Sequence, residues 1–183
     1  MTGWGWMALA ALLAAPAAAA AVKDDSYVDA AGGRVLREWI VVDATRADAW
    51  KAFTTDDGFK WAAPAHITPG NGGLIEFGFS PPFKPGDAMN VKNRIDVYLP
   101  DELLVFHNEF VPAIPGGPFD PASFGAVRTL IAFEDAGAGK TKVTETVVGF
   151  GTGAKFDQLY AHLRGGNAQY LATLAASFHG AKP

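Results

Sequence analysis

The chain has 183 residues, of which 49% are hydrophobic and 19% are charged, a composition typical of a folded globular protein. Its 15 Lys and Arg residues against 19 Asp and Glu residues give a net charge of −4 without a long basic run, so no nucleic-acid partner is expected. The absence of cysteine excludes disulfides, thiol catalysis and a lipid-modified N-terminal cysteine.

The N-terminal segment has the pattern of a secretory signal. Trp6 to Ala15 is apolar and helix-favouring, Pro16 interrupts it, and Ala19 to Ala21 offers small residues for cleavage. No Lys or Arg precedes the apolar run, so an uncleaved anchor is the alternative, although the run is shorter than the about 20 residues of a membrane span. We predict a signal peptide over residues 1–21, no stable membrane span after cleavage, and a periplasmic or secreted location.

The segment after the signal is polar and ends in two glycines. We therefore predict a linker over residues 22–33 and a single domain over residues 34–180. The apolar stretch from Val35 to Val42 predicts the first strand of this domain.

Two short helices are expected next. Thr45 lies three residues before Asp48, the spacing of an N-cap, and the helix that follows would carry Trp50 and Phe53 inward. A second short helix is expected over Thr54 to Trp61, before a proline stops it.

Six further strands follow, each bounded by Gly, Pro, Asn or Asp turn residues. Their short connections predict an antiparallel meander, because a parallel pair needs a long crossover. They are expected at Ala65–Thr68, Leu74–Phe79, Val91–Leu99, Leu103–Val111, Val127–Glu134 and Thr141–Val148.

The chain closes with a Gly-rich elbow and one long amphipathic helix. Its apolar residues recur at spacings of three and four, on one helical face. They are Phe156, Leu159, Tyr160, Leu163, Tyr170, Leu171, Leu174 and Phe178. We predict an α+β fold in which a curved antiparallel sheet of about seven strands wraps around this helix and leaves room for a small molecule.

Alternation along the strands predicts which side chains point inward. Leu104, Phe106, Asn108 and Phe110 are expected on one inner face, whereas Val97 and Tyr98 compete for the inner face of their strand. In the last strand, Glu145 lies between Val143 and Val147 on an otherwise apolar face. A carboxylate there is costly unless it is paired or hydrated, so Glu145 either serves a pocket or reaches water at an open edge.

No motif indicates a cofactor, a metal or a catalytic group. Gly149 to Ala154 has the letters of a dinucleotide fingerprint but lacks the following strand of a βαβ unit, so a flexible elbow explains the glycines. The four histidines lack metal-ligand spacing, and no serine lies in a GxSxG elbow.

Four segments resemble one known family. They are Ile40 to Thr55, Trp61, Arg94 to Phe110 and the ending Thr141 to Phe178. The chain resembles the helix-grip (SRPBCC) superfamily, which includes START lipid-transfer domains, the birch-pollen-allergen fold and polyketide cyclases. Within it, the chain is similar to the bacterial domains named after the activator of the ninety-kilodalton heat-shock-protein ATPase. The resemblance implies a helix-grip fold over essentially the whole domain.

The chain departs from these relatives in places that bear on a pocket. Asn108 stands where relatives tend to have Trp, and Glu145 where they tend to be aliphatic. The loop Pro112–Phe124 is longer than usual, with aromatic or apolar anchors at Ile114, Phe119 and Phe124.

Gly165 and Gly166 lie in the middle of the closing helix, next to Asn167. They create a low spot facing the sheet, either to accommodate a large sheet residue or to form a notch for a ligand.

The favoured function is a non-catalytic domain that holds a small apolar or amphipathic molecule between the sheet and the C-terminal helix. Its predicted ligand-binding residues are Trp61, Phe77, Phe79, Phe106, Asn108, Phe110, Glu145, Tyr160, Leu163, Asn167 and Tyr170. One alternative is a polyketide-cyclase-like or hydrolase-like enzyme with Glu145 as base. Another is an interaction module that recognises an envelope protein through the Pro-rich loop and the outer sheet face.

Overall fold

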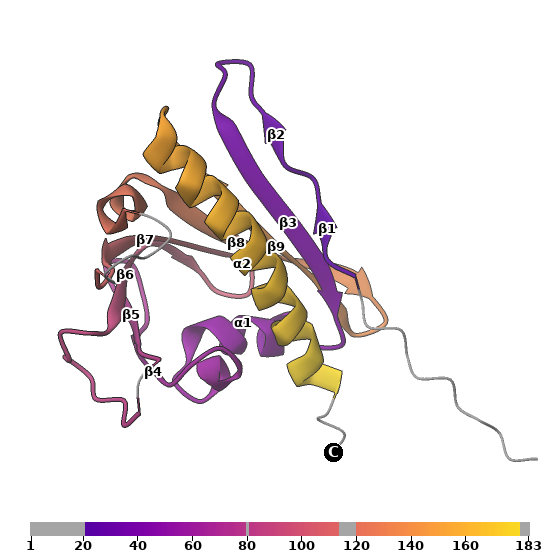
Figure 1. Cartoon of the computed structure of the whole chain (residues 1–183). Helices are drawn as coiled ribbons and strands as arrows, with labels where there is room; N and C mark the ends of the chain where they lie inside the picture. The colour runs from indigo at the N-terminus through magenta and orange to yellow at the C-terminus, as the bar shows by residue number, and fades with distance from the viewer. Residues whose placement is uncertain (1–20, 80, 114–119, 180–183) are drawn as a thin grey trace, which may run out of the picture.

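A curved antiparallel sheet wraps around one long helix in the computed structural model, which describes residues 21–79, 81–113 and 120–179 (Figure 1). In this part of the chain the sheet has nine strands, in the order β1-β3-β9-β8-β7-β6-β5-β4, with β2 also paired to β3. The strands are β1 (Lys23–Asp24), β2 (Tyr27–Val28), β3 (Arg34–Val42), β4 (Ala65–Thr68), β5 (Leu74–Phe77), β6 (Val91–Leu99), β7 (Leu103–Phe110), β8 (Arg128–Gly137) and β9 (Lys140–Val148). The predicted α+β architecture is confirmed.

The segment predicted to be a linker contributes two of these strands. β1 and β2 pair in turn with β3, and the Trp39 indole Nε1 donates a hydrogen bond to Asp25 Oδ2 at 2.7 Å. These short strands cover an edge of β3 that would otherwise present unpaired backbone groups, which is why the segment is ordered. The linker prediction is therefore wrong for this segment.

The predicted signal peptide falls on residues 1–20, outside the described residues, and on Ala21. Within the described ranges, no helix is both long enough and apolar enough to cross a membrane.

Four helical elements accompany the sheet in the described residues. Helix α1 (Arg46–Thr54) begins as predicted, because the Thr45 side chain accepts a hydrogen bond from the Asp48 backbone N–H. The second predicted helix is a single 3₁₀ turn, η1 (Gly58–Trp61), and a further 3₁₀ element that was not predicted, η2 (Pro121–Ala126), lies in the Pro-rich loop. Helix α2 (Ala154–His179) crosses the concave face of the sheet, with α1 below it in Figure 1.

Two β-bulges between β6 and β7 decide which side chains face α2. Lys92 pairs with Phe110 while Asn93 pairs with Asn108, so Glu109 is an extra residue in β7. An extra residue shifts the alternation by one position, which places Phe110 with Lys92 on the outer face, 43% exposed. The prediction that Phe110 faces inward is therefore wrong.

The second bulge lies at Asp96 in β6. Ile95 pairs with Phe106 and Val97 with Val105, so the alternation changes again and Tyr98 turns inward. The Tyr98 ring packs edge-on against Trp50, with centroids 4.8 Å apart. Tyr98, not Val97, thus occupies the inner face.

Candidate functional site

A cavity of about 520 Å³ lies between the sheet and helix α2. Strands β5 to β9 form one wall, and α1, η1 and α2 form the other. The volume is within the range of about 300–1,000 Å³ that small-molecule sites occupy. The walls are mostly apolar, with a few polar side chains among them.

Eight of the predicted site residues line this cavity. The apolar and aromatic members are Phe77, Phe79, Phe106, Leu163 and Tyr170, and the polar members are Asn108, Glu145 and Asn167. Phe79 is 77% exposed and lies at the mouth together with Met89, which is 62% exposed. Val111, Pro112 and Phe124, from both ends of the Pro-rich loop, also contribute to the lining. Its expected anchors Ile114 and Phe119 lie outside the described residues.

Three predicted site residues do not line the cavity. Phe110 lies on the outer face, as described above. Trp61 lies behind the wall: its Nε1 donates to the Ala52 carbonyl at 2.9 Å, and its ring centroid is 4.3 Å from that of Tyr170. The Tyr160 ring packs against Phe150, with centroids 5.1 Å apart, in a separate hydrophobic cluster.

Glycine opens space at the helix wall. Gly166 lines the cavity, and a Cβ built on it would meet no atom within 4 Å, nor would one on Gly165. The helix continues through both glycines. Neither glycine is therefore needed to accommodate a large sheet residue, and Gly166 leaves open space at the cavity wall.

Asn93 and Asn108 form the polar edge of the cavity on β6 and β7. The two are cross-strand partners, and the Asn108 side-chain amide donates a hydrogen bond to Asn93 Oδ1. Asn93 lies two residues from both Val91 and Ile95, so alternation places it on the same inner face as they are. The sequence analysis did not identify Asn93, because it left open whether Val97 or Tyr98 marks the inner face of this strand.

Glu145 lies on the cavity floor, inside the sheet. The side chain is only 7% exposed, and its Oε2 is fully buried with no hydrogen-bond partner among the described residues. Burial raises the pKa of Glu145 from 4.5 to about 8, and the neighbouring Glu38 carboxylate adds to this effect. The prediction left Glu145 open between an edge and a pocket, and the structure places it in the pocket.

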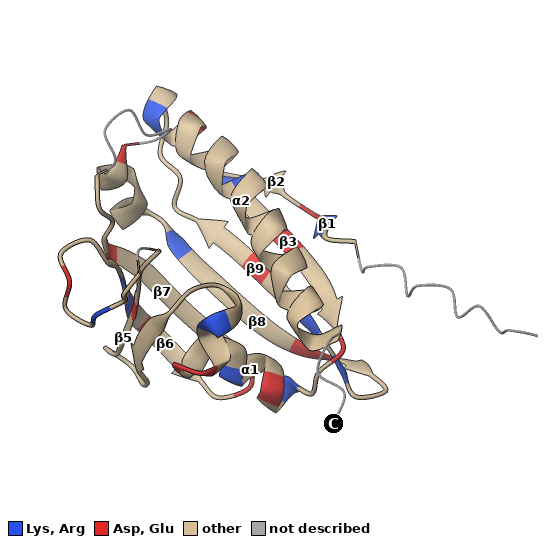
Figure 2. Cartoon of the chain, turned by 60° about the horizontal axis from the view of Figure 1, so that its bottom comes forward, with Lys and Arg blue, Asp and Glu red and all other residues tan. Residues whose placement is uncertain are grey.

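A second carboxylate, Glu38, lies directly across the strand pair from Glu145. It is 3% exposed, and its Oε2 also has no hydrogen-bond partner in the described ranges. Burial raises the pKa of Glu38 to about 7, with a further increase from Asp24 and an opposing effect of Arg164. Figure 2 shows the acidic segments of β3 and β9, in red, next to one another beneath α2.

The antiparallel register brings the two carboxylates together. Leu36 pairs with Val147 on one side of the Glu38–Glu145 pair, and Ile40 pairs with Val143 on the other. All four flanking residues are fully buried, and the pair lies between the two hydrophobic clusters of the core. Sequence reasoning missed Glu38, although its place between Leu36 and Ile40 is the same signal that identified Glu145.

The groups above the pair come from helix α2. Burial and the Glu145 carboxylate raise the pKa of the Tyr170 phenol, and burial lowers the pKa of His162, another lining residue. Two ion pairs hold the helix to the N-terminal strands: Arg164 donates from Nε and Nη2 to Asp24, and Arg34 Nη1 donates to Asp157 Oδ1 at 2.8 Å.

Solved structures share this arrangement of sheet and helix. The Aha1 dimer from Colwellia psychrerythraea is 20% identical, and the match covers 79% of this chain and 95% of that chain with a TM-score of 0.57. CalU16 from Micromonospora echinospora is 14% identical over 90% of this chain and 87% of that chain, with a TM-score of 0.59. Protein MLL2253 from Mesorhizobium loti is 12% identical over 82% of this chain and 100% of that chain, with a TM-score of 0.62.

The chain has the helix-grip fold. The resemblance stated from the sequence is thus confirmed at the level of fold, including the similarity to Aha1. No protein-family model matches the sequence, and no curated protein matches it.

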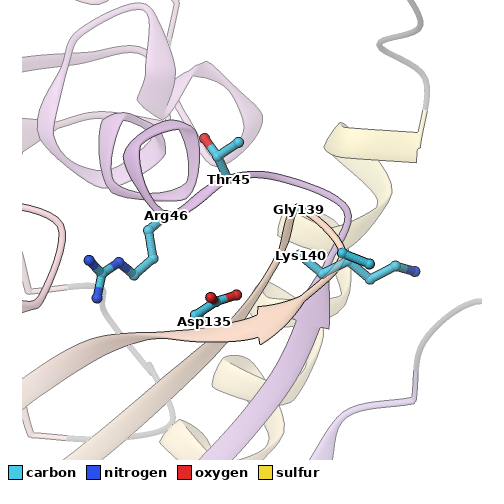
Figure 3. Close-up of a pocket in the computed structure, with 6 residues that line it drawn as sticks. Thr45, Arg46, Asp135, Gly139 and Lys140 are labelled. Atoms are coloured by element: carbon cyan, nitrogen blue, oxygen red, sulfur yellow. The ribbon is translucent and has the colours of Figure 1, made fainter.

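A second hollow, of about 370 Å³, lies on the protein surface between the β8–β9 hairpin and the start of α1 (Figure 3). Arg46 lines it, and three of its other polar groups have structural partners. Asp135 accepts a hydrogen bond from the Gly137 N–H, Thr45 caps α1, and Lys140, which points away from Asp135 in Figure 3, pairs with Asp43 at 2.7 Å. The cavity beneath α2 is larger and has a more apolar lining, so it is the better candidate for a small-molecule site.

No group of three or more His, Cys, Asp or Glu side chains suited to a metal ion occurs in the described part of the chain.

Proposed function

We propose that this protein is a non-catalytic domain that binds a small apolar or amphipathic molecule between its sheet and helix α2. The supporting observation is the mostly apolar cavity of about 520 Å³, which remains open although the hydrophobic clusters on either side of it are closely packed. Interior space of this size forfeits packing energy unless a guest or solvent occupies it. The exposed Phe79 and Met89 at the mouth give an apolar guest a route of entry.

The same proposal places the protein in the periplasm or outside the cell, without a membrane span once residues 1–21 are removed. The proposed location rests on the apolar run of the N-terminal segment and on the small residues that follow it, which suit cleavage of a signal peptide. Fractionation of the native cells tests it: a full-length chain retained in the membrane fraction would contradict export by cleavage.

A matched pair of glycine substitutions tests the cavity. Gly166→Phe is expected to weaken binding of Nile red, or of decanol that displaces it, by at least about tenfold, because the new ring projects into open space beside the guest. Fluorescence titration measures this. Neither Gly166→Phe nor the control Gly165→Phe is expected to lower the melting temperature, because both replace a mid-helix glycine with a better helix former.

Gly165 does not line the cavity, so Gly165→Phe is expected to bind the dye as the wild type does. Equal binding by both variants, or no binding by the wild type, would contradict a guest site beneath α2.

A cyclase-like or hydrolase-like enzyme is the second candidate, because Glu145 lines the cavity with a raised pKa and Asn108 lines the same space. With a pKa of about 8, Glu145 is mostly protonated at neutral pH, which suits a general acid better than the predicted base. A substrate whose turnover is lost in Glu145→Gln would favour this candidate over a pure binder.

A further inference from the structure

Two carboxylates lie side by side under α2 without a cationic partner. Glu38 and Glu145 are cross-strand neighbours, and each has a buried, unpaired Oε2. Among the described residues, no Lys or Arg forms an ion pair with either one. Arg164, which lowers the pKa of Glu38, is itself bound to Asp24 through two hydrogen bonds. The pair therefore carries acceptor capacity that the protein does not satisfy.

A structural explanation of the pair is weak. Buried carboxylates are costly, and the same strand pair is filled by aliphatic residues immediately before and after them. The Oε2 atom of each carboxylate forms no hydrogen bond with another described residue. Glu145 lines the cavity wall, so the carboxyl group that carries the unsatisfied Oε2 borders the space a guest would occupy.

We propose that the guest carries a protonated amine, and that its ammonium group lies against Glu145 with Glu38 beside it. This inference rests on the proposed function and names the chemical class of the ligand. An ammonium group donates up to three hydrogen bonds, and Glu145 supplies an acceptor for it at the cavity wall in a site of low dielectric constant. Glu38 does not line the cavity and contributes negative charge from behind Glu145. The apolar remainder of the guest packs on Phe106, Ile131 and Leu163.

The other groups around the pair do not supply the missing charge. From α2, His162 is neutral at pH 7 because burial lowers its pKa, and the Tyr170 phenol is held in its neutral form. From β1, Asp24 adds negative potential at Glu38, and Arg164 offsets part of it. From β8, the residue opposite Glu145 is the apolar Ile131. An anionic guest such as a fatty acid is disfavoured at this end, because it is repelled by whichever of the two carboxyl groups is ionised.

Three probes of equal chain length test the inference by isothermal titration calorimetry on the protein: decylamine, decanol and decanoate, each below its micelle concentration. At pH 7.5, decylamine is expected to bind at least about tenfold more tightly than decanol, and decanoate more weakly than both, because charge-assisted hydrogen bonds are stronger than neutral ones. Equal affinity of the amine and the alcohol would overturn the inference.

The proton balance gives a second readout that does not depend on affinity. Free Glu145 is largely protonated at pH 7 since its pKa is about 8, and a bound ammonium group favours its ionised form. Decylamine binding is therefore expected to release up to about one proton, measured from the heats in buffers of different ionisation enthalpy. Decanol binding should release none.

Two variants of the same kind locate the effect. Glu145→Gln is expected to retain decanol binding, which shows that it is folded, and to lose both the preference for the amine and the proton release. Glu134→Gln removes an exposed carboxylate of β8 that pairs with Lys142, and should behave as the wild type. If decanol binds but the preference for the amine survives in Glu145→Gln, the inference of an amine guest is contradicted and the proposed binding function stands. If no probe binds to the wild type, both are contradicted.

Discussion

The ionisation of Glu145 alone is expected to lower the free energy of unfolding by about 3–5 kcal/mol as the pH rises from 5 to 9, the opposite of ordinary acid denaturation. The cause is Glu145, whose pKa rises from 4.5 to about 8 in the folded protein. Between these two values the folded state binds more protons than the unfolded state, so stability is complete below pH 4.5 and is lost as the pH rises through 8. Glu38, with a pKa of about 7, changes stability in the same direction.

Urea titrations followed by tryptophan fluorescence across this pH range measure the effect. Glu145→Gln should remove the larger share of the slope and leave the share due to Glu38. Glu134→Gln, which removes the exposed carboxylate that pairs with Lys142, should leave the slope unchanged. The lowered pKa values of Asp24, Asp43 and Asp48 act only at more acidic pH, where stability falls as they become protonated. A stability that is constant or rising from pH 5 to 8 would show that the two carboxylates are not buried as described.

Phe53→Ala should destabilise the protein by about 3–5 kcal/mol, the range for a fully buried aromatic ring. Phe53 is 2% exposed and lies at the centre of an aromatic group, with ring centroids 5.5 Å from Trp61, 5.6 Å from Phe133 and 6.4 Å from Tyr170. It also lines the cavity, so its loss enlarges a void that the surrounding side chains cannot refill. Chemical denaturation at pH 6 measures the change.

Phe79→Ala is the matched control, because it removes the same ring from a position that lines the same cavity but is 77% exposed. Its effect on unfolding should stay within about 0.5 kcal/mol. Similar losses for the two variants would indicate that Phe79 is covered in solution or that Phe53 is not central to the core.

The order of elements could be predicted because each main strand shows alternation or turn chemistry of its own. The two short strands β1 and β2 could not, since two residues are too few for a pattern and their order comes from pairing with β3. The face of Phe110 was mispredicted for a related reason. A bulge is set by how β6 and β7 pair, and neither strand reveals it alone.

The site was predicted in part. Glu145 could be identified because a carboxylate interrupts an apolar face, and Glu38 carries the same signal, but their contact depends on the register between β3 and β9. The open volume beside Gly166 depends on how α2 lies over the sheet. Helical periodicity predicts which face of α2 is apolar and not its height above the strands.

The location of a bound guest is the most direct test. With ¹³C-labelled methyl groups and decanol, nuclear Overhauser effects are expected from the decyl chain to Ile131 and Leu163, which line the cavity. None are expected to Leu36 or Leu159, which are fully buried and do not line the cavity. Contacts to Val105 or Leu130 on the outer face, or no contacts at saturating decanol, would contradict a guest held between the sheet and helix α2.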